Sequence, residues 1–111
     1  TYWFRFVVRY DSAATTTGSG WAINGPTSPP YLHGTSTYTL TATSETNNSF
    51  TAYDIPAAAN ATSLTTGNVA VVEGFITPSA SGTVILRFRS EVNSSAVTAL
   101  AGSTVEWKRV L

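Results

Sequence analysis

The sequence predicts an all-β fold, and three observations lead to this prediction. Short runs of β-branched and aromatic residues recur along the chain, with turn-forming residues about every 8–12 positions. No segment shows the period of about 3.6 residues that marks an amphipathic helix. The two strongest strand patterns are Thr1–Tyr10 and Ser103–Leu111. We therefore predict a jelly-roll sandwich of about eight antiparallel strands, with its first and last strands side by side. An immunoglobulin-like sandwich is the alternative.

The first predicted strand, Thr1–Tyr10, divides cleanly by parity, because successive side chains of a strand point to opposite faces. One parity is apolar and predicts the core face: Tyr2, Phe4, Phe6, Val8 and Tyr10. The other parity is amphipathic: Trp3, Arg5, Val7 and Arg9. The second face of this strand is therefore suited to a contact with another surface rather than to water alone.

The middle of the chain predicts shorter strands separated by turns. Strands are expected over Trp21–Asn24, Ser36–Ser44 and Phe50–Ile55, each followed by turn-forming or proline residues. Glu45–Ser49 is predicted to be a turn. Ala57–Gly67 begins with alanines, but Thr, Asn and Ser dominate the rest of it, so we predict a loop rather than a helix.

The clearest pairing that the sequence predicts is a hairpin between Asn68–Thr77 and Gly82–Val92, with Pro78–Ser81 supplying the turn. The second strand of this hairpin presents an apolar parity toward the predicted core: Val84, Leu86 and Phe88. A short strand around Ala96–Leu100 and the final strand Ser103–Leu111 complete the predicted sandwich.

Charge and hydropathy argue against several classes of partner. Charged residues make up 11% of the chain, less than half of the roughly 25% usual in soluble domains. Six basic and six acidic residues give a formal net charge of zero, which argues against a nucleic-acid-binding surface. No apolar run approaches the roughly 20 residues that cross a bilayer. We therefore expect no nucleic acid and no membrane as partners, and little repulsion between copies of the chain.

The length of 111 residues predicts a single sandwich domain over residues 1–111. The chain contains no Cys, so disulfides and thiolate chemistry are excluded. It also contains no Met, even at its first position. We expect the sequence to be a C-terminal module of a longer chain, or a chain that lacks part of its N-terminal sequence.

Groups for catalysis or metal binding are few. His33 is the single histidine, and its proline-rich surroundings (PPYLHG) offer neither an orienting carboxylate nor a nucleophile. One His and no Cys exclude a typical zinc site, and no calcium-loop motif is present. Six carboxylates are scattered along the chain, with Glu73 and Glu91 as candidate partners of the arginines. We therefore predict that the protein is not an enzyme and has no cofactor, no metal and no catalytic residue.

Aromatic residues are the best candidates for a ligand surface. Trp21 and Tyr31 flank a loop rich in Gly and Pro, and His33 lies two residues after Tyr31. Rings that stack on sugar faces would suit a receptor-binding module, so Trp21, Tyr31 and His33 form the candidate ligand surface. The competing interpretation, favoured because large aromatic residues are usually buried, is that Trp21 caps the open end of the sandwich and Trp3 packs against a neighbouring subunit.

Three segments carry a resemblance to a known class of proteins: Trp21–Pro26 (WAINGP), Val72–Val92 and Ala101–Leu111. They resemble small jelly-roll modules of tailed-bacteriophage virion proteins, which serve as head decorations, head fibres or tail tips. Their layout is also similar to that of trimeric C1q- and tumour-necrosis-factor-like domains. The resemblance includes no site, so no functional residue carries over from it.

The resemblance implies a virion structural protein, a trimeric capsid decoration or fibre module in the extracellular particle. It implies a homotrimer, with other virion proteins such as capsid or tail as further partners. In such trimers the sheet with the terminal strands packs about the threefold axis. The expected subunit interface is therefore Trp3, Arg5, Val7, Arg9, Ile85 and Arg87. The alternative function is a carbohydrate- or receptor-binding adhesion module of a tail or cell-surface protein, with a host-surface glycan as its ligand.

Overall fold

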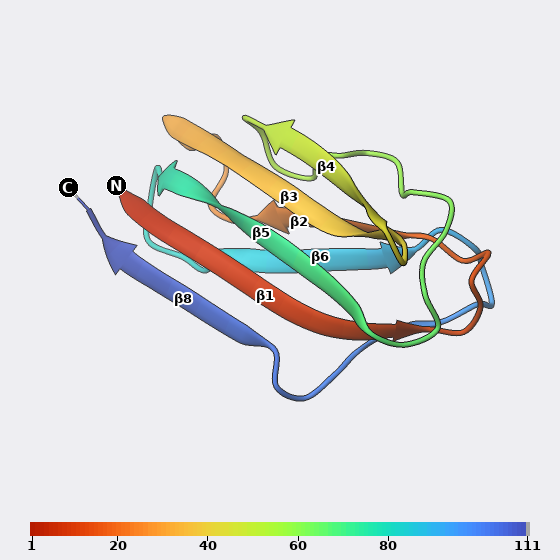
Figure 1. Ribbon diagram of the computed structural model, residues 1–111. Helices are drawn as coiled ribbons and strands as arrows, with labels where there is room; N and C mark the ends of the chain where they lie inside the picture. The colour runs from red at the N-terminus through yellow and green to blue at the C-terminus, as the bar shows by residue number, and fades with distance from the viewer. Residues whose placement is uncertain (111) are drawn as a thin grey trace.

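The computed structural model describes residues 1–110, which form eight antiparallel strands in two sheets (Figure 1). The prediction of an all-β sandwich is confirmed, and no helix occurs among the described residues. The strands in chain order are β1 (Tyr2–Ser12), β2 (Ser19–Asn24), β3 (Tyr31–Thr41), β4 (Ser44–Phe50), β5 (Asn68–Thr77), β6 (Ile85–Ser90), β7 (Val97–Ala99) and β8 (Thr104–Arg109). Residues 1–110 contain no helix long and apolar enough to cross a membrane.

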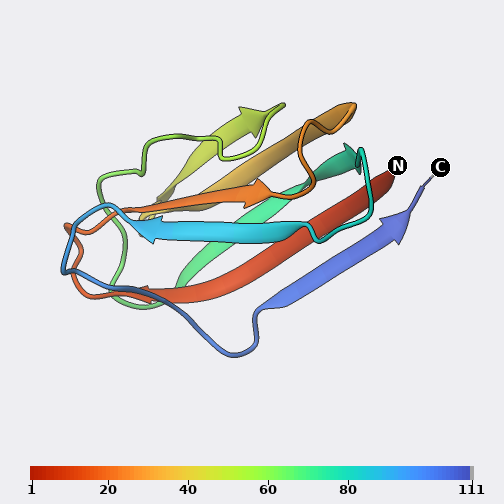
Figure 2. The ribbon, with the colours of Figure 1, turned by 180° about the vertical axis from the view of Figure 1, so that it is seen from behind.

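The two sheets differ greatly in width. The large sheet has the order β4-β3-β5-β1, and the far edge of β1 pairs with β8 along its first half and with β7 at its end. The small sheet contains only β2 and β6. The predicted pairing of the terminal strands is confirmed, with Tyr2 opposite Arg109, so β1 and β8 lie side by side (Figures 1 and 2).

The core lies between the inner face of the large sheet and the small sheet. Trp21 on β2 is fully buried, and its ring centroid lies 4.7 Å from that of Tyr10 and 4.7 Å from that of Phe88. Its indole Nε1–H donates to Ser19 Oγ at 2.9 Å, so its polar atom is also satisfied. The predicted core face of β1 is confirmed: Phe4, Val8 and Tyr10 are buried, and Tyr2 and Phe6 pack against them.

Two asparagines fasten the long connection between β4 and β5 to the sandwich. Asn60 accepts a hydrogen bond from Ser19 N–H and donates to the Thr39 carbonyl, at 2.8 and 3.0 Å. Asn68 is buried, and its amide donates to the carbonyls of Tyr10 and Leu64. Residues 57–67 form a loop, as predicted, because these side-chain bonds take the place of a helical hydrogen-bond ladder.

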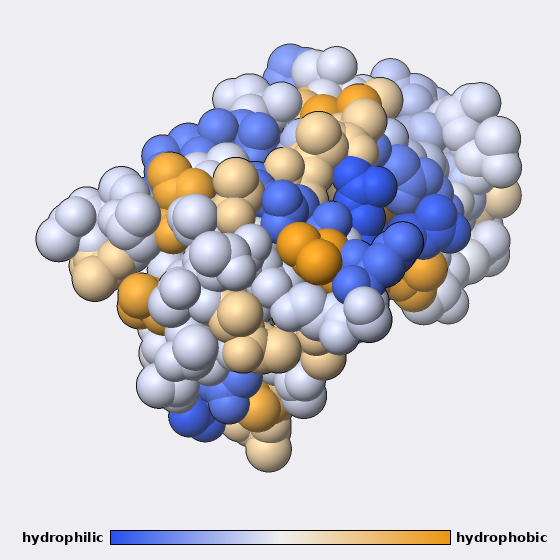
Figure 3. Space-filling model, turned by 90° about the vertical axis from the view of Figure 1, so that its right-hand side faces the viewer, coloured by the Kyte–Doolittle hydropathy of each residue, from blue (hydrophilic) through white to orange (hydrophobic). Residues whose placement is uncertain are grey.

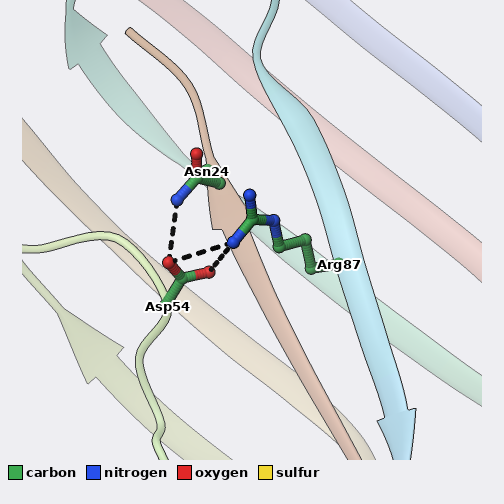
Figure 4. A network of polar contacts seen from close by, with 3 residues as sticks. All are labelled: Asn24, Asp54 and Arg87. Carbon is green, nitrogen blue, oxygen red and sulfur yellow. Dashed lines mark hydrogen bonds and ion pairs between the residues drawn. The ribbon is translucent and has the colours of Figure 1, made fainter. Parts of the chain in front are cut away.

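A surface network holds the start of the same connection against the small sheet (Figure 4). Asp54 Oδ1 forms an ion pair with Arg87 Nη1 at 3.2 Å. Asp54 Oδ2 accepts a hydrogen bond from Asn24 Nδ2 at 2.8 Å. Asp54 adopts a left-handed backbone conformation, with φ of 57°, and its N–H donates to the Ile23 carbonyl at 2.9 Å. The carboxylate therefore links β2, β6 and the connection through one side chain.

Three predicted local structures are wrong. The expected hairpin of β5 with β6 does not form, because β5 pairs with β1 and β3 whereas β6 pairs with β2 in the other sheet. The apolar parities of β5 and β6 face each other across the core, so the segment between them crosses from one sheet to the other. The predicted turn at Glu45–Ser49 is instead part of β4, an edge strand that pairs with β3. Thr46 and Asn48 are half-buried on its inner parity, and Asn48 donates to Tyr38 Oη at 3.3 Å. The expected strand over Phe50–Ile55 is a set of bends and turns after its first residue.

Candidate interaction surfaces

The structure separates the three residues of the candidate ligand surface. Trp21 has no exposed surface, so its ring cannot meet a ligand and its place in that surface was predicted wrongly. Its apolar neighbours on β1 and β6 enclose it in the core. Tyr31 and His33 lie together at the start of β3, with stacked rings whose centroids are 4.7 Å apart. Both are exposed on the outer face of the large sheet.

His33 borders a shallow depression of about 560 Å³ on this outer face. Gly34 and Gly74 lie opposite each other across β3 and β5, and their missing side chains leave room for Phe50 and for the main chain around His33. Phe75 lies opposite both His33 and Trp3 and is 44% exposed. The further lining residues are mainly polar: Thr35, Ser49, Thr51 and Glu73. We call this surface the outer-face depression.

The sequence did not single out Phe75, although the alternation of β5 was enough to find it. Ala70, Val72 and Ile76 are buried, so odd-numbered residues of β5 face outward. An aromatic residue on that parity is an exposed ring. What the alternation could not show is that β1 and β3 place Trp3 and His33 on either side of it.

The six residues of the predicted subunit interface lie on two opposite faces. The outer face of the large sheet carries four of them, on β1: Trp3, Arg5, Val7 and Arg9. The outer face of the small sheet carries the other two, on β6: Ile85 and Arg87. All three arginines contact their own chain. Arg5 Nε lies 3.3 Å from Glu73, as the sequence suggested, Arg9 donates to the Ala101 carbonyl, and Arg87 contacts Asp54. One continuous contact patch therefore cannot contain all six residues.

A second surface follows from the unequal width of the sheets. The small sheet covers the middle of the large sheet, and β8 lies beyond it (Figures 1 and 2). Val105 and Trp107 lie opposite Phe6 and Phe4, so they belong to the inner face. They are nevertheless 56% and 68% exposed. The sequence predicted this strand but not its exposure, because no local pattern tells how far the second sheet extends.

An apolar groove of about 470 Å³ runs beside β8. Trp107 packs against Tyr2, with ring centroids 6.0 Å apart, and Trp107 and Val105 form one wall of the groove. The opposite wall comes from the connection between β5 and β6, including Pro78 and Val84. Among residues 1–110, no strand pairs with the outer edge of β8. We call this region, β8 with its groove, the β8 side. By contrast, the end of the molecule where the loops gather has only small, scattered hydrophobic patches (Figure 3).

Titratable groups add little chemistry to either surface. Burial raises the pKa of the Tyr38 phenol, which also accepts a hydrogen bond from Asn48, and burial raises the pKa of the Tyr53 phenol. Both tyrosines make interior contacts and line neither surface. No group of three or more His, Asp or Glu side chains that could hold a metal ion occurs in the described part of the chain.

Comparison of the chain with family models, with curated proteins and with solved structures finds no match.

Proposed function

We propose that this protein is a structural module that acts by self-association, with the β8 side as its contact surface. The observation that supports the proposal is the 68% exposure of Trp107 on the inner face of an edge strand. Burying a large aromatic ring is among the most favourable single contributions to an interface. An apolar patch beside an unpaired strand edge combines two features that favour association, exposed apolar surface and free main-chain groups.

The resemblance of the chain to jelly-roll modules of tailed-bacteriophage virions supports a more specific role. We propose a capsid decoration or fibre module, in contact with capsid or tail proteins on the extracellular particle. The zero formal net charge suits close packing of many copies, since it leaves little long-range repulsion between them. The threefold assembly that the resemblance implies is one of the stoichiometries to be tested.

Native mass, measured by light scattering after gel filtration over a range of concentrations, tests self-association. We expect a multiple of the 11.7 kDa chain mass. Trp107→Ser should weaken association about 30-fold or more, as expected for an aromatic anchor. At a dilution where both proteins are monomeric, it should leave the melting temperature nearly unchanged, because the ring is mostly exposed in the single chain.

Val69→Ser is the matched control, because Val69 is exposed on the outer face of β5, away from β8. This variant should keep the native mass of the wild type. A wild-type protein that stays monomeric at every concentration would contradict the proposed function.

The outer-face depression favours a second candidate function, carbohydrate binding by an adhesion module. Phe75, Trp3 and His33 supply rings, and Glu73 and Thr35 supply acceptors and a hydroxyl, which is the mixture typical of sugar sites. Lys108 Nζ lies 5.8 Å from the centroid of the Trp3 ring, so this ring is already in contact on one side and Phe75 is the freer platform.

Screening on a glycan array, followed by calorimetry, tests this second function. Phe75→Ala should weaken binding of any glycan that the wild type binds by about tenfold or more. Val69→Ser should bind it normally. If no glycan binds the wild type, or if Phe75→Ala binds as well as the wild type, the depression is not the binding site.

A further inference from the structure

The main-chain groups on the open edge of β8 can be identified from its pairing with β1. Val110 N–H donates to the Thr1 carbonyl at 2.9 Å, in the same register that places Lys108 opposite Trp3. Main-chain groups of a strand point alternately to its two sides, so the even-numbered residues of β8 face β1. The N–H and carbonyl groups of Val105, Trp107 and Arg109 therefore face the open edge.

The side chains of β8 alternate between the faces of the large sheet. Glu106 and Lys108 lie opposite Arg5 and Trp3 and so belong to the outer face. Trp107 lies opposite Phe4 and belongs to the inner face. The edge therefore carries one acidic and one basic residue on its outer side, two positions apart, with the exposed indole between them on the inner side.

This arrangement is complementary to itself in one antiparallel register. When Trp107 of one copy lies opposite Trp107 of another, Glu106 of each copy lies opposite Lys108 of the other. The symmetry makes this favourable charge pair twice, and opposite charges across an antiparallel pair stabilise it. The residues with free main-chain groups then meet in hydrogen-bonded positions, with Val105 opposite Arg109.

The neighbouring symmetric registers are less favourable. An axis at Glu106 places Glu106 opposite its own copy, and an axis at Lys108 does the same for Lys108. Like charges directly opposite each other destabilise a strand pair. The charge pattern of β8 therefore selects the axis at Trp107.

We propose that two copies of this chain join by antiparallel pairing of their β8 strands, about a twofold axis at Trp107. Their large sheets then form one continuous sheet, and each exposed indole packs beside the other. The proposal rests on the proposed self-association and specifies its geometry. It places a twofold contact where the resemblance implies a threefold one.

Disulfide cross-linking of single-cysteine variants tests the register of the β8–β8 pair directly, because the chain has no Cys of its own. Opposed residues in an antiparallel pair have Cα atoms about 4.5–5.5 Å apart, within reach of a disulfide. Trp107→Cys should therefore give a disulfide-linked dimer under mild oxidation, whereas Val105→Cys and Glu106→Cys should not. The double variant Val105→Cys/Arg109→Cys keeps Trp107 and should also link two copies. Linkage through position 105 or 106 alone would overturn the register.

Charge reversal tests the same contact by sedimentation equilibrium. Glu106→Lys and Lys108→Glu should each raise the dimer dissociation constant about tenfold or more. The double variant Glu106→Lys/Lys108→Glu exchanges the two signs and should restore association. Glu45→Lys is the control for net charge, since it makes the same change on β4, at the opposite edge of the large sheet, and should have no effect.

The outcomes separate this inference from the proposed function. A wild-type dimer whose charge variants behave as described supports both. Suppose that Trp107→Ser weakens association of the wild-type oligomer, but the cysteine variants do not cross-link and the charge variants do not change the dissociation constant. That result keeps the proposed function and overturns the twofold pairing. A double charge variant as weak as the single ones also overturns the pairing. A wild-type monomer at all concentrations overturns both.

Discussion

Trp21→Ala is expected to lower the free energy of unfolding by about 3–5 kcal/mol, the range for removing a large aromatic side chain from a core. Trp21 has no exposed surface and stacks on Phe88 at an interplanar angle of 13°. Its removal also takes away the hydrogen bond that the indole N–H donates to Ser19 Oγ. A domain of this size has a total stability of about 5–15 kcal/mol, so this loss is a large fraction of the total. Urea denaturation followed by circular dichroism measures the change.

Two further substitutions separate burial from the simple loss of an indole. Trp21→Phe keeps a ring in the core and loses the hydrogen bond and part of the volume, so it should cost clearly less than Trp21→Ala. Trp107→Ala removes the same side chain from a site that is 68% exposed, so it should change the stability of the dissociated chain, measured at high dilution, by less than about 1 kcal/mol. Equal losses for Trp21→Ala and Trp107→Ala would contradict the described core.

Gly74→Ala is expected to lower the free energy of unfolding by about 3 kcal/mol or more. A Cβ atom on Gly74 would lie 2.2 Å from the His33 carbonyl oxygen and 2.5 Å from Gly34 Cα. Both contacts involve main chain of β3, which cannot move aside without disturbing its pairing with β5. The same denaturation measurement reports the loss, and Gly34→Ala should behave similarly because its Cβ would lie 2.3 Å from the ring of Phe50.

Gly20→Ala is the matched control for this pair. Gly20 lies in strand β2, and an added Cβ would be 3.4 Å from its nearest heavy atom, which is an ordinary contact. This variant should change stability by less than about 1 kcal/mol. If Gly74→Ala were as well tolerated as Gly20→Ala, the close approach of β3 and β5 would be incorrect.

These expectations change how the function can be tested. Replacing Trp21 cannot distinguish a ligand-binding role from a structural one, because the loss of the core would affect every readout. Phe75 and Trp107 are the informative positions, since both are exposed, Phe75 at the outer-face depression and Trp107 at the β8 side. Their variants can therefore change binding or assembly while the sandwich stays folded.

The sequence by itself determined that the fold is all-β, where most of the strands lie and which face of the first strand is buried. It misassigned Glu45–Ser49 and Phe50–Ile55, where short polar and aromatic residues are mixed and the strand pattern is weak. Side-chain alternation is a local property of a strand, so the apolar parity of β1 and the extent of β5 could be predicted without knowing any partner. The absence of a helical period likewise identified residues 57–67 as a loop. The pairing of Arg5 with Glu73 was among the predicted ion pairs because few charges exist to choose from.

Only the tertiary structure decided which strands pair and which faces are covered. The run from β5 to β6 fits a hairpin and a crossing between sheets equally well, since both put the apolar parity inside. Trp21 is a core residue and Trp107 an exposed one, although each lies in a strand of six residues. The difference arises because the small sheet has two strands and ends before β8. The coverage of a strand depends on contacts between residues far apart in sequence, and no local pattern carries that information.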